Sequence, residues 1–314
     1  MKNYSPTLRG PFTHENLAIF LIHRNGECRT PSYRVLEEAL RSGEVLVHET
    51  GTVGQLEVEN LSHDSDLFIQ AGDVVKGGRQ DRTLGVDFIL PPSSGRVPIP
   101  AFCVESGRWH KRLTEDERHF SSSGSSIHHK QARLAAKLAQ NQGAVWSAIA
   151  ESQEALSVTL GKSIHAKASP TSYQLSVEDA DLQQRKATFE KALRDIVPSE
   201  DDSTVGYAFY VDGERNTADL YGSPELFRKL WPKLLDVAVL EALSSRPGGK
   251  KKRHPTIKQA DAWLATHANG ELHDDRQVPP RVRVLTRVHP DNVVFETFDT
   301  SSAGEAVHVN IVAR

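Results

Sequence analysis

The first 110 residues alternate short apolar runs with polar turns, and this pattern predicts strands. The runs are rich in Val, Ile, Leu and Phe, and turn residues separate them at spacings typical of an antiparallel sheet. In order they are NLAIFLIH, VLVHET, QLEVEN, DLFIQAGDVV, TLGVDFIL and VPIPAFCVE. A short amphipathic helix, YRVLEEALRSGEV, interrupts them, with Leu36, Ala39 and Leu40 on one face and Gly43 as its stop. We therefore expect an antiparallel β-sandwich or barrel-like region at the N-terminal end.

Beyond this region, longer periodic segments predict helices mixed with strands. A long helix is expected from Gln131 through QARLAAKLAQNQGAVWSAIAESQEAL, and a second helix over DADLQQRKATFEKALRDIV. VGYAFYVDGERNTADLYG predicts a hairpin with Asp212-Gly213 as its turn. SPELFRKLWPKLLDVAVLEALSS predicts a helix that Ser223 caps and Pro232 kinks or splits. The end, RVRVLTRVHPDNVVFETFDT and EAVHVNIVAR, is strand-like, so the expected fold class is α+β.

Polar connections divide the chain into segments. LTEDERHFSSSGSSIHHKQ is rich in Ser, Gly and His and predicts a mobile loop, and RPGGKKKRHP predicts a basic linker. The expected segments are a β-rich region at 1–112, the mobile loop at 113–131, an α/β region with long helices and a hairpin at 132–245, the basic linker at 246–256, and a C-terminal α+β segment at 257–314.

Composition narrows the class of protein. Of 314 residues, 38% are hydrophobic and 25% charged, ordinary values for a soluble globular protein. The net charge of -3 does not favour nucleic acid as a partner, and we interpret GKKKRH as a solvated linker. No apolar run reaches the roughly 18 residues that span a bilayer, and the N-terminus lacks a secretory pattern. We expect a cytoplasmic protein without a membrane partner.

The cysteines and histidines do not form a recognisable metal pattern. Cys28 and Cys103 lie far apart, so they predict neither a disulfide framework nor a four-thiolate site. The spacing of the histidines at 110, 119, 128 and 129 fits none of the established zinc patterns. We therefore expect no metal and no cofactor.

Two polar stretches carry the groups suited to chemistry. The first is GDVVKGGRQDR, Gly72–Arg82, between two predicted strands, and the second is CVESGRW, Cys103–Trp109. If TLGVDFIL and VPIPAFCVE pair as a hairpin, the strand ends bearing Arg82 and Glu105 lie near each other. So many polar groups on two neighbouring segments exceed what a turn needs, and they indicate a site.

The expected ligand is an anionic small molecule. Glycines let the backbone approach a ligand and offer it amides, arginines supply fixed forks for phosphate or carboxylate, and a tryptophan can stack on a ring. The expected ligand-binding residues are Lys76, Gly77, Gly78, Arg79, Gln80, Arg82, Arg108 and Trp109. In the alternative interpretation, Arg82 and Arg108 pair with Asp73, Asp81 or Glu105 in a structural network, and the glycines serve only the turn.

Three side chains are candidate catalytic groups. Cys103 could act as a nucleophile, because Glu105 at i+2 shares its strand face and Arg108 could favour a thiolate. Asp73 and Glu105 could form a general acid/base pair if one of them were desolvated. A buried structural cysteine on a strand is the alternative for Cys103.

The order of several motifs resembles a known family. GDVVKGGRQDRTL, VPIPAFCVESGRW, NQGAVW, SPTSYQ and VDGERNTADLYGSPELFRKLWPKLL together are similar to the ARG and rhodanese-phosphatase-superfamily-associated protein domain, where ARG stands for ADP-ribosylglycohydrolase. The resemblance covers roughly Leu17 to Leu243. The family commonly has Glu, Lys and Asn where this chain has Asp73, Arg79 and Asp81. The resemblance implies a bacterial protein without an established reaction.

Two functions follow as hypotheses. The first is a hydrolase or transferase that acts on a nucleotide or a phosphorylated small molecule, and the family's association with ADP-ribosylglycohydrolases implies ADP-ribose or a relative. The second is a non-catalytic sensor or scaffold domain that binds such a ligand, or a protein partner, beside a separate enzyme. The sequence favours the second, because it offers no complete nucleophile–base–orienter set, no metal motif and no G-x-x-x-x-G-K-[ST] phosphate loop.

Overall fold

The computed structural model describes residues 7–24, 30–112, 115–245, 253–302 and 304–314. Within it the chain forms two compact units, one of 1–32, 189–238 and 249–314 and the other of 33–188 and 239–248. Helices α5 (Ala180–Leu193) and α6 (Pro224–Ser244) each cross from one unit to the other. Neither unit is continuous in sequence, so the units do not coincide with the contiguous segments expected from the polar connections.

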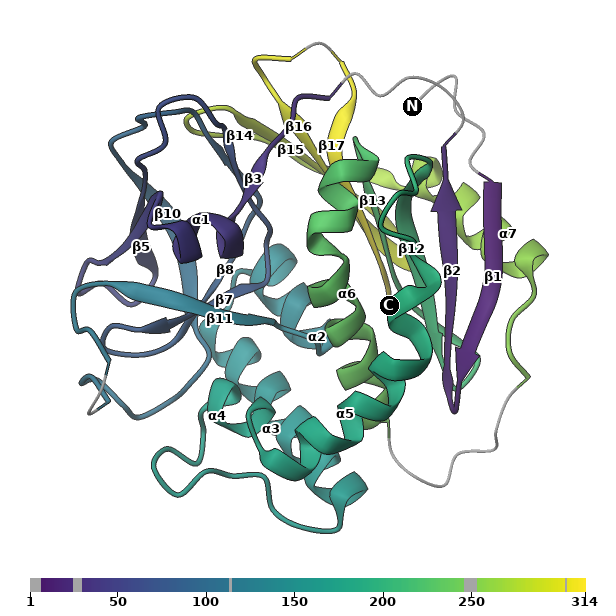
Figure 1. Ribbon diagram of the computed structural model, residues 1–314, viewed down its shortest axis with the longest axis horizontal. Coiled ribbons are helices and arrows are strands. Elements are labelled where there is room, and N and C mark those ends of the chain that lie inside the picture. Colours follow the sequence, from purple (N-terminus) through teal and green to yellow (C-terminus); the bar gives the residue numbers. More distant parts are fainter. Residues whose placement is uncertain (1–6, 25–29, 113–114, 246–252, 303) are drawn as a thin grey trace. The chain divides into compact units, whose positions relative to one another are not determined.

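The first unit is built on an eight-stranded antiparallel sheet in the order β1-β2-β12-β13-β17-β16-β15-β14 (Figure 1). Its strands are β1 (Thr7–His14), β2 (Leu17–His23), β12 (Thr204–Val211), β13 (Glu214–Tyr221), β14 (Glu271–Val278), β15 (Val282–His289), β16 (Asn292–Asp299) and β17 (Ala306–Ala313). The predicted hairpin turn is confirmed: β12 pairs with β13, and Asp212 and Gly213 both have positive φ, as a type I′ turn requires.

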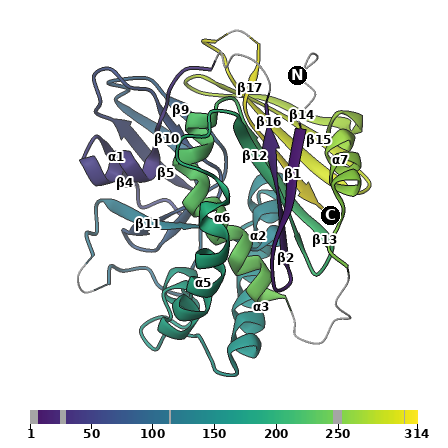
Figure 2. The same ribbon diagram turned by 45° about the vertical axis from the view of Figure 1, so that its right-hand side comes forward.

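Helices cover both faces of this sheet. Helix α7 (Ile257–Ala265) places Trp263 against Phe20 and Tyr210 on one face, and Figure 2 shows the helix beside β1. Tyr207 lies an odd number of positions before Tyr210 on the same strand, and its ring contacts Trp231 of α6 on the opposite face. Because side chains alternate across a strand, a single strand serves two cores. The short 3-10 helices Arg194–Ile196 and Thr266–Asn269 follow α5 and α7.

The second unit holds the motif-bearing strands in a six-stranded antiparallel sheet, in the order β11-β7-β8-β10-β5-β4. These strands are β4 (Val45–Glu49), β5 (Gln55–Asn60), β7 (Asp73–Gly77), β8 (Arg82–Leu84), β10 (Arg96–Cys103) and β11 (Phe120–Ser126). An isolated bridge pairs His48 of β4 with His119, the residue before β11, and so brings the two edges of the sheet together in a barrel-like manner. The α+β class predicted from the sequence is confirmed.

The remaining elements of this unit surround the barrel-like sheet. A three-stranded sheet contains β3 (Arg34–Val35), β6 (Leu67–Ile69) and β9 (Phe88–Leu90). The helices are α1 (Leu36–Ser42), α2 (Lys130–Leu134), a π-helical turn (Ala135–Ala139), α3 (Gln142–Leu160) and α4 (Tyr173–Val177).

Several local expectations differ from the structure. The Ser-rich segment expected to be a loop contains strand β11, because its backbone pairs with β7 and the Ser121 and Ser123 hydroxyls donate to the carbonyls of Lys76 and Val74. The single long helix expected from Gln131 is interrupted at Asn141, whose side chain caps a new helix by accepting from Ala144 N. Helix α6 continues through Pro232 and is not split. Cys28 and most of the expected basic linker lie outside the described residues.

Candidate functional site

The stretch Gly72–Arg82 forms β7, a tight turn and the start of β8. Gly77 and Gly78 have φ of 131° and 55°, a region that side chains rarely adopt. A Cβ at Gly78 would lie 2.8 Å from Glu49 Oε2 and closer still to the Phe120 ring. The turn therefore needs glycine at position 78 for both its backbone conformation and its close packing.

The backbone amides of this turn donate hydrogen bonds to other groups of the protein. Gly77 N donates to Asp81 Oδ1 at 3.1 Å, and Arg79 N donates to Glu49 Oε2 at 3.1 Å. Gly78 N donates to the carbonyl of Asp116 at 3.0 Å. An anion-binding backbone nest needs amides that point at a ligand, and here two carboxylates of the protein take that place.

Buried opposite charges connect the two motif stretches. Asp81 and Glu105 are both fully buried. Arg112 Nη2 donates to both carboxylate oxygens of Asp81 at 2.5 Å, and Arg108 Nε donates to Glu105 Oε2 at 2.9 Å. Burial raises the pKa of Asp81, while the hydrogen bonds and charge of Arg112 act against that rise. Arg108 thus pairs with Glu105, as in the structural alternative, whereas Asp81 pairs with Arg112 and Arg82 faces Glu49, two residues that the alternative did not include.

Glu105 also fixes the neighbouring backbone. Its second carboxylate oxygen accepts from the Ser169 hydroxyl, and its carbonyl accepts from Gln80 Nε2 at 3.2 Å. Arg108 Nη1 donates to the carbonyl of His110 at 2.5 Å. Gln80, Glu105 and Arg108 therefore make hydrogen bonds within the protein around the turn, and their expected ligand-binding or catalytic roles stay predictions.

The other two candidate catalytic groups are also buried. Asp73 accepts from Gln70 N and from the Ser126 hydroxyl, which ties β7 to β11. Burial raises the pKa of the Cys103 thiol, so this sulfur is held as a thiol rather than as a reactive thiolate. The backbone of Cys103 is held by both amide atoms of Gln142, at 2.8 and 2.9 Å. Catalytic roles for Asp73, Cys103 and Glu105 stay predictions, and none of the three lines the cleft described next.

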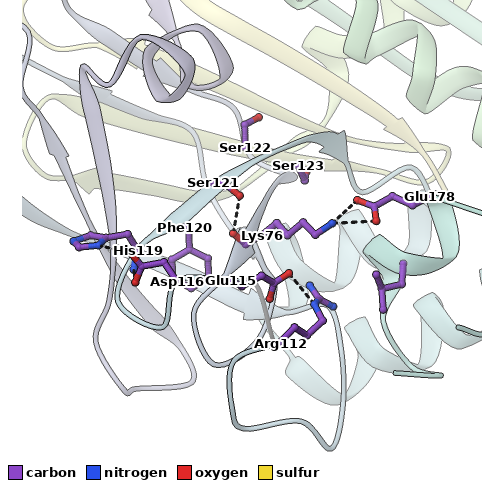
Figure 3. A pocket seen from close by; sticks show the side chains of 11 residues that line it. Lys76, Arg112, Glu115, Asp116, His119, Phe120, Ser121, Ser122, Ser123 and Glu178 are labelled. Atoms are coloured by element: carbon purple, nitrogen blue, oxygen red, sulfur yellow. Dashed lines mark hydrogen bonds and ion pairs between the residues drawn. The ribbon is translucent and has the colours of Figure 1, made fainter. Parts of the chain in front are cut away.

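A cleft of about 730 Å³ opens on the second unit beside β11. It is lined by Lys76, Arg112, Glu115, Asp116, His119, Phe120, Ser121, Ser122, Ser123, Leu175 and Glu178. Figure 3 shows the Lys76 ammonium directed to Glu178 at one end, and His119 with Asp116 at the other. Of the expected ligand-binding residues, Lys76 alone lines this cleft.

The charges in the cleft are paired. Lys76 Nζ lies 2.7 Å from Glu178 Oε1, and Arg112 Nε donates to Glu115 Oε1 at 2.8 Å. Burial raises the pKa of Glu178, but hydrogen bonds from Lys76 and Gln174 bring it below its usual value. Among the described residues, three carboxylates line the cleft beside two permanent cations, so the electrostatic potential in the cleft is not strongly positive.

Arg79, Arg82 and Trp109 gather at a different place in the same unit. The Arg82 guanidinium is fully buried, and its Cζ lies 5.5 Å from the centre of the Trp109 ring. The Cζ of Arg79 lies 5.7 Å from the same ring, which remains 40% exposed. These distances fit cation–π contacts. The eight expected ligand-binding residues are thus divided among the turn, the cleft and this Trp109 cluster.

Sequence reasoning missed several of the residues that build the site. Arg112, Glu115 and Asp116 stood in or beside the segment expected to be a loop, and Glu49 and Glu178 lie far from both motifs in sequence. One local signal was present: Arg112 and Glu115 are three residues apart, and their side chains pair. The long-range partners gave no such signal.

Comparison with known families decides what the motifs belong to. A family model described as the ARG and rhodanese-phosphatase-superfamily-associated protein domain matches residues 6–312. The chain belongs to this family. The match confirms the resemblance seen in the motifs and extends it over both units, including the C-terminal strands. No curated protein and no solved structure matches the chain.

Among the residues that the structure describes, none of the helices combines the length and the hydrophobicity that a membrane-spanning helix needs. Over the same ranges, His, Cys, Asp and Glu side chains do not assemble into a group of three that could hold a metal ion.

Proposed function

We propose that this protein is a non-catalytic binding domain that takes up a polar small molecule in the cleft beside β11. The observation that carries this proposal is the cleft itself, whose volume of about 730 Å³ lies within the range of small-molecule sites. The candidate catalytic groups Asp73, Cys103 and Glu105 are buried and do not line the cleft. Binding without turnover needs none of them.

The ligand we propose is an anionic one of the nucleotide or ADP-ribose type, with its anionic group on Lys76. The partner of Lys76, Glu178, is 42% exposed, and exposed ion pairs contribute at most about 1 kcal/mol. A phosphate can therefore replace Glu178 on Lys76 at low cost, while serine hydroxyls of β11 offer hydrogen bonds to sugar groups. Because carboxylates outnumber permanent cations in the cleft, we expect a monophosphate to bind better than a triphosphate.

The test is a thermal-shift comparison of adenosine, AMP, ATP and ADP-ribose. A ligand at 100 times its Kd should stabilise the fold by about 2.7 kcal/mol. We expect AMP or ADP-ribose to raise the Tm more than ATP, and the increase to disappear in Lys76→Ala. Lys162→Ala is the matched control, because Lys162 also pairs with surface carboxylates but does not line the cleft. If none of the compounds shifts the Tm of the folded protein, the small-molecule proposal fails and a protein partner becomes the better explanation.

A second candidate function is catalysis on the same ligand, which one pair of side chains favours. His119 Nδ1 lies 3.2 Å from Asp116 Oδ2, and both line the cleft. A histidine oriented by a carboxylate is a recurring general base. If the domain is an enzyme, His119→Gln should reduce turnover by about 100-fold or more while ligand binding persists. Absence of any product from the wild-type protein with bound ligand would leave the binding domain as the function.

A further inference from the structure

Arg82 is a buried cation whose hydrogen bonds are incomplete. Its Nη1 donates to the carbonyl of Gln80 at 3.0 Å. Its Nε and Nη2 have no hydrogen-bond partner among the described residues, although the side chain is fully buried. A buried donor without an acceptor costs about 1–3 kcal/mol, and more when the group is charged. The fold therefore retains an unfavourable arrangement at this position.

The two unused donors form one edge of the guanidinium. In arginine, the Nε–H and the adjacent Nη2–H point the same way, which is the geometry that matches both oxygens of a carboxylate or a phosphate. The nearest carboxylate does not fill this edge. Glu49 Oε2 lies 3.7 Å from Arg82 Nη2, and the two Glu49 oxygens accept instead from Gly51 N and Arg79 N.

The surroundings of this edge carry an excess of positive charge. The guanidinium groups of Arg79 and Arg82 both lie within 6 Å of the Trp109 ring centre, whereas Glu49 is the carboxylate that faces Arg82. Trp109 is 40% exposed although it covers a buried cation. None of these four residues lines the cleft beside β11.

We propose that Arg82, Arg79 and Trp109 form a second site that binds an oxyanion, either a carboxylate or a phosphate group. The Trp109 side chain turns aside, the Nε–Nη2 edge of Arg82 binds two oxygens of the anion, and Arg79 supplies a second positive charge. The indole then packs against the bound group. This site is separate from the cleft and does not depend on the function proposed for it.

The test uses Trp109→Ala, with inorganic phosphate and acetate as probes at constant ionic strength. Removal of the indole opens access to Arg82, so phosphate or acetate should raise the Tm of Trp109→Ala more than chloride does. Trp146→Ala is the matched control, because Trp146 is similarly exposed, at 36%, on α3. The two probes distinguish the two classes of oxyanion. A response to phosphate alone assigns a phosphorylated ligand, and a response to acetate alone assigns a carboxylate.

Additional variants locate the anion. In the background of Trp109→Ala, Arg79→Gln should weaken the phosphate or acetate response, and Lys76→Ala should leave it intact. Arg82→Gln should abolish the response, and the Arg79→Gln result decides the matter if Arg82→Gln does not fold. An equal response of Trp109→Ala and Trp146→Ala would overturn the proposal, as would a response that disappears with Lys76→Ala, because the anion would then lie in the cleft.

Discussion

At the scale of single residues, Asp81 shows how a motif can serve the fold. It stands in the glycine turn, which the sequence analysis interpreted as a loop that binds an anion. In the structure its carboxylate accepts from Gly77 N and from Arg112 and lies completely buried. Its negative charge is therefore matched by an arginine of the protein itself.

The first prediction concerns Arg112→Gln. The substitution leaves the buried Asp81 carboxylate without its main counter-charge and should lower the free energy of unfolding by about 3 kcal/mol at neutral pH. Burial already raises the pKa of Asp81, and loss of Arg112 raises it further. A group whose folded pKa is raised stabilises the fold at low pH and loses this contribution as pH rises, so the deficit should shrink as the pH is lowered. Urea unfolding of the wild-type protein and of Arg112→Gln at several pH values measures this difference in the free energy of unfolding.

Arg96→Gln is the control for this prediction. Arg96 is 60% exposed and lies 3.8 Å from Glu57, so its removal should cost less than about 1 kcal/mol. A deficit for Arg112→Gln that equals that of Arg96→Gln, or that does not change with pH, would contradict the interpretation.

At the scale of elements, the side chain of His128 links three helices, α3, α4 and α6, beside the end of strand β11. It follows β11, and its Nδ1 lies 2.8 Å from the Tyr173 hydroxyl of α4. Its Nε2 lies 2.7 Å from the Ser152 hydroxyl of α3 and 3.0 Å from the Ser244 hydroxyl of α6. The Tyr173 hydroxyl donates to the carbonyl of Ser126, so its oxygen accepts the hydrogen bond from Nδ1–H of His128. Burial lowers the pKa of this imidazole and keeps it neutral.

The second prediction follows from this neutral histidine. Burial, with the nearby His129, Arg133 and Lys186, lowers the pKa of His128 well below 6.5. Below about pH 6.5, His128 therefore binds a proton in the unfolded chain but not in the folded chain, and the free energy of unfolding should fall as the pH drops. In His128→Gln the free energy of unfolding should be about 1–3 kcal/mol lower at neutral pH and should vary less with pH.

Chemical unfolding at about pH 7.5 and about pH 5.5 tests the prediction. His63→Gln serves as the control, because His63 is exposed and its Nδ1 lies 3.3 Å from the hydroxyl of Ser93. If His128→Gln loses stability on acidification as steeply as the wild-type protein, His128 does not produce the pH dependence.

At the scale of the whole molecule, the chain builds two units from interleaved segments. It passes from the eight-stranded sheet into the second unit, returns along α5 to the first unit, enters the second unit again along α6, and then adds strands β14–β17 to the first. The cleft and the Trp109 cluster are made by residues of the second unit alone. A bound ligand should therefore reduce local unfolding in the second unit alone.

The third prediction is a hydrogen-exchange pattern. With AMP bound in the cleft, the amides of β7, β11 and α4 should exchange more slowly, and those of β15, β16 and β17 should be unchanged. Lys76→Ala should show no ligand-dependent protection. Slower exchange across the eight-stranded sheet would mean that the ligand binds elsewhere or couples the two units.

The sequence by itself determined the elements whose signals are local. The Asp212-Gly213 turn, the Ser223 start of α6 and the alternation of the apolar strands follow from backbone preferences and short-range periodicity. The motifs also determined the family, because their order along the chain is itself the signal. A Ser-rich strand such as β11 carries no such signal, since its stability comes from pairing with β7.

The tertiary structure alone decided which polar and charged groups meet. Asp81 and Arg112 are separated by 31 residues, Lys76 and Glu178 by 102, and His128 and Ser244 by 116. A composition or a motif cannot specify such pairs, because any arginine can pair with any carboxylate until packing brings two of them together. For the same physical reason, the residues of the two motif stretches separate into a buried network, a cleft and the Trp109 cluster only when neighbouring strands fix the direction of each side chain.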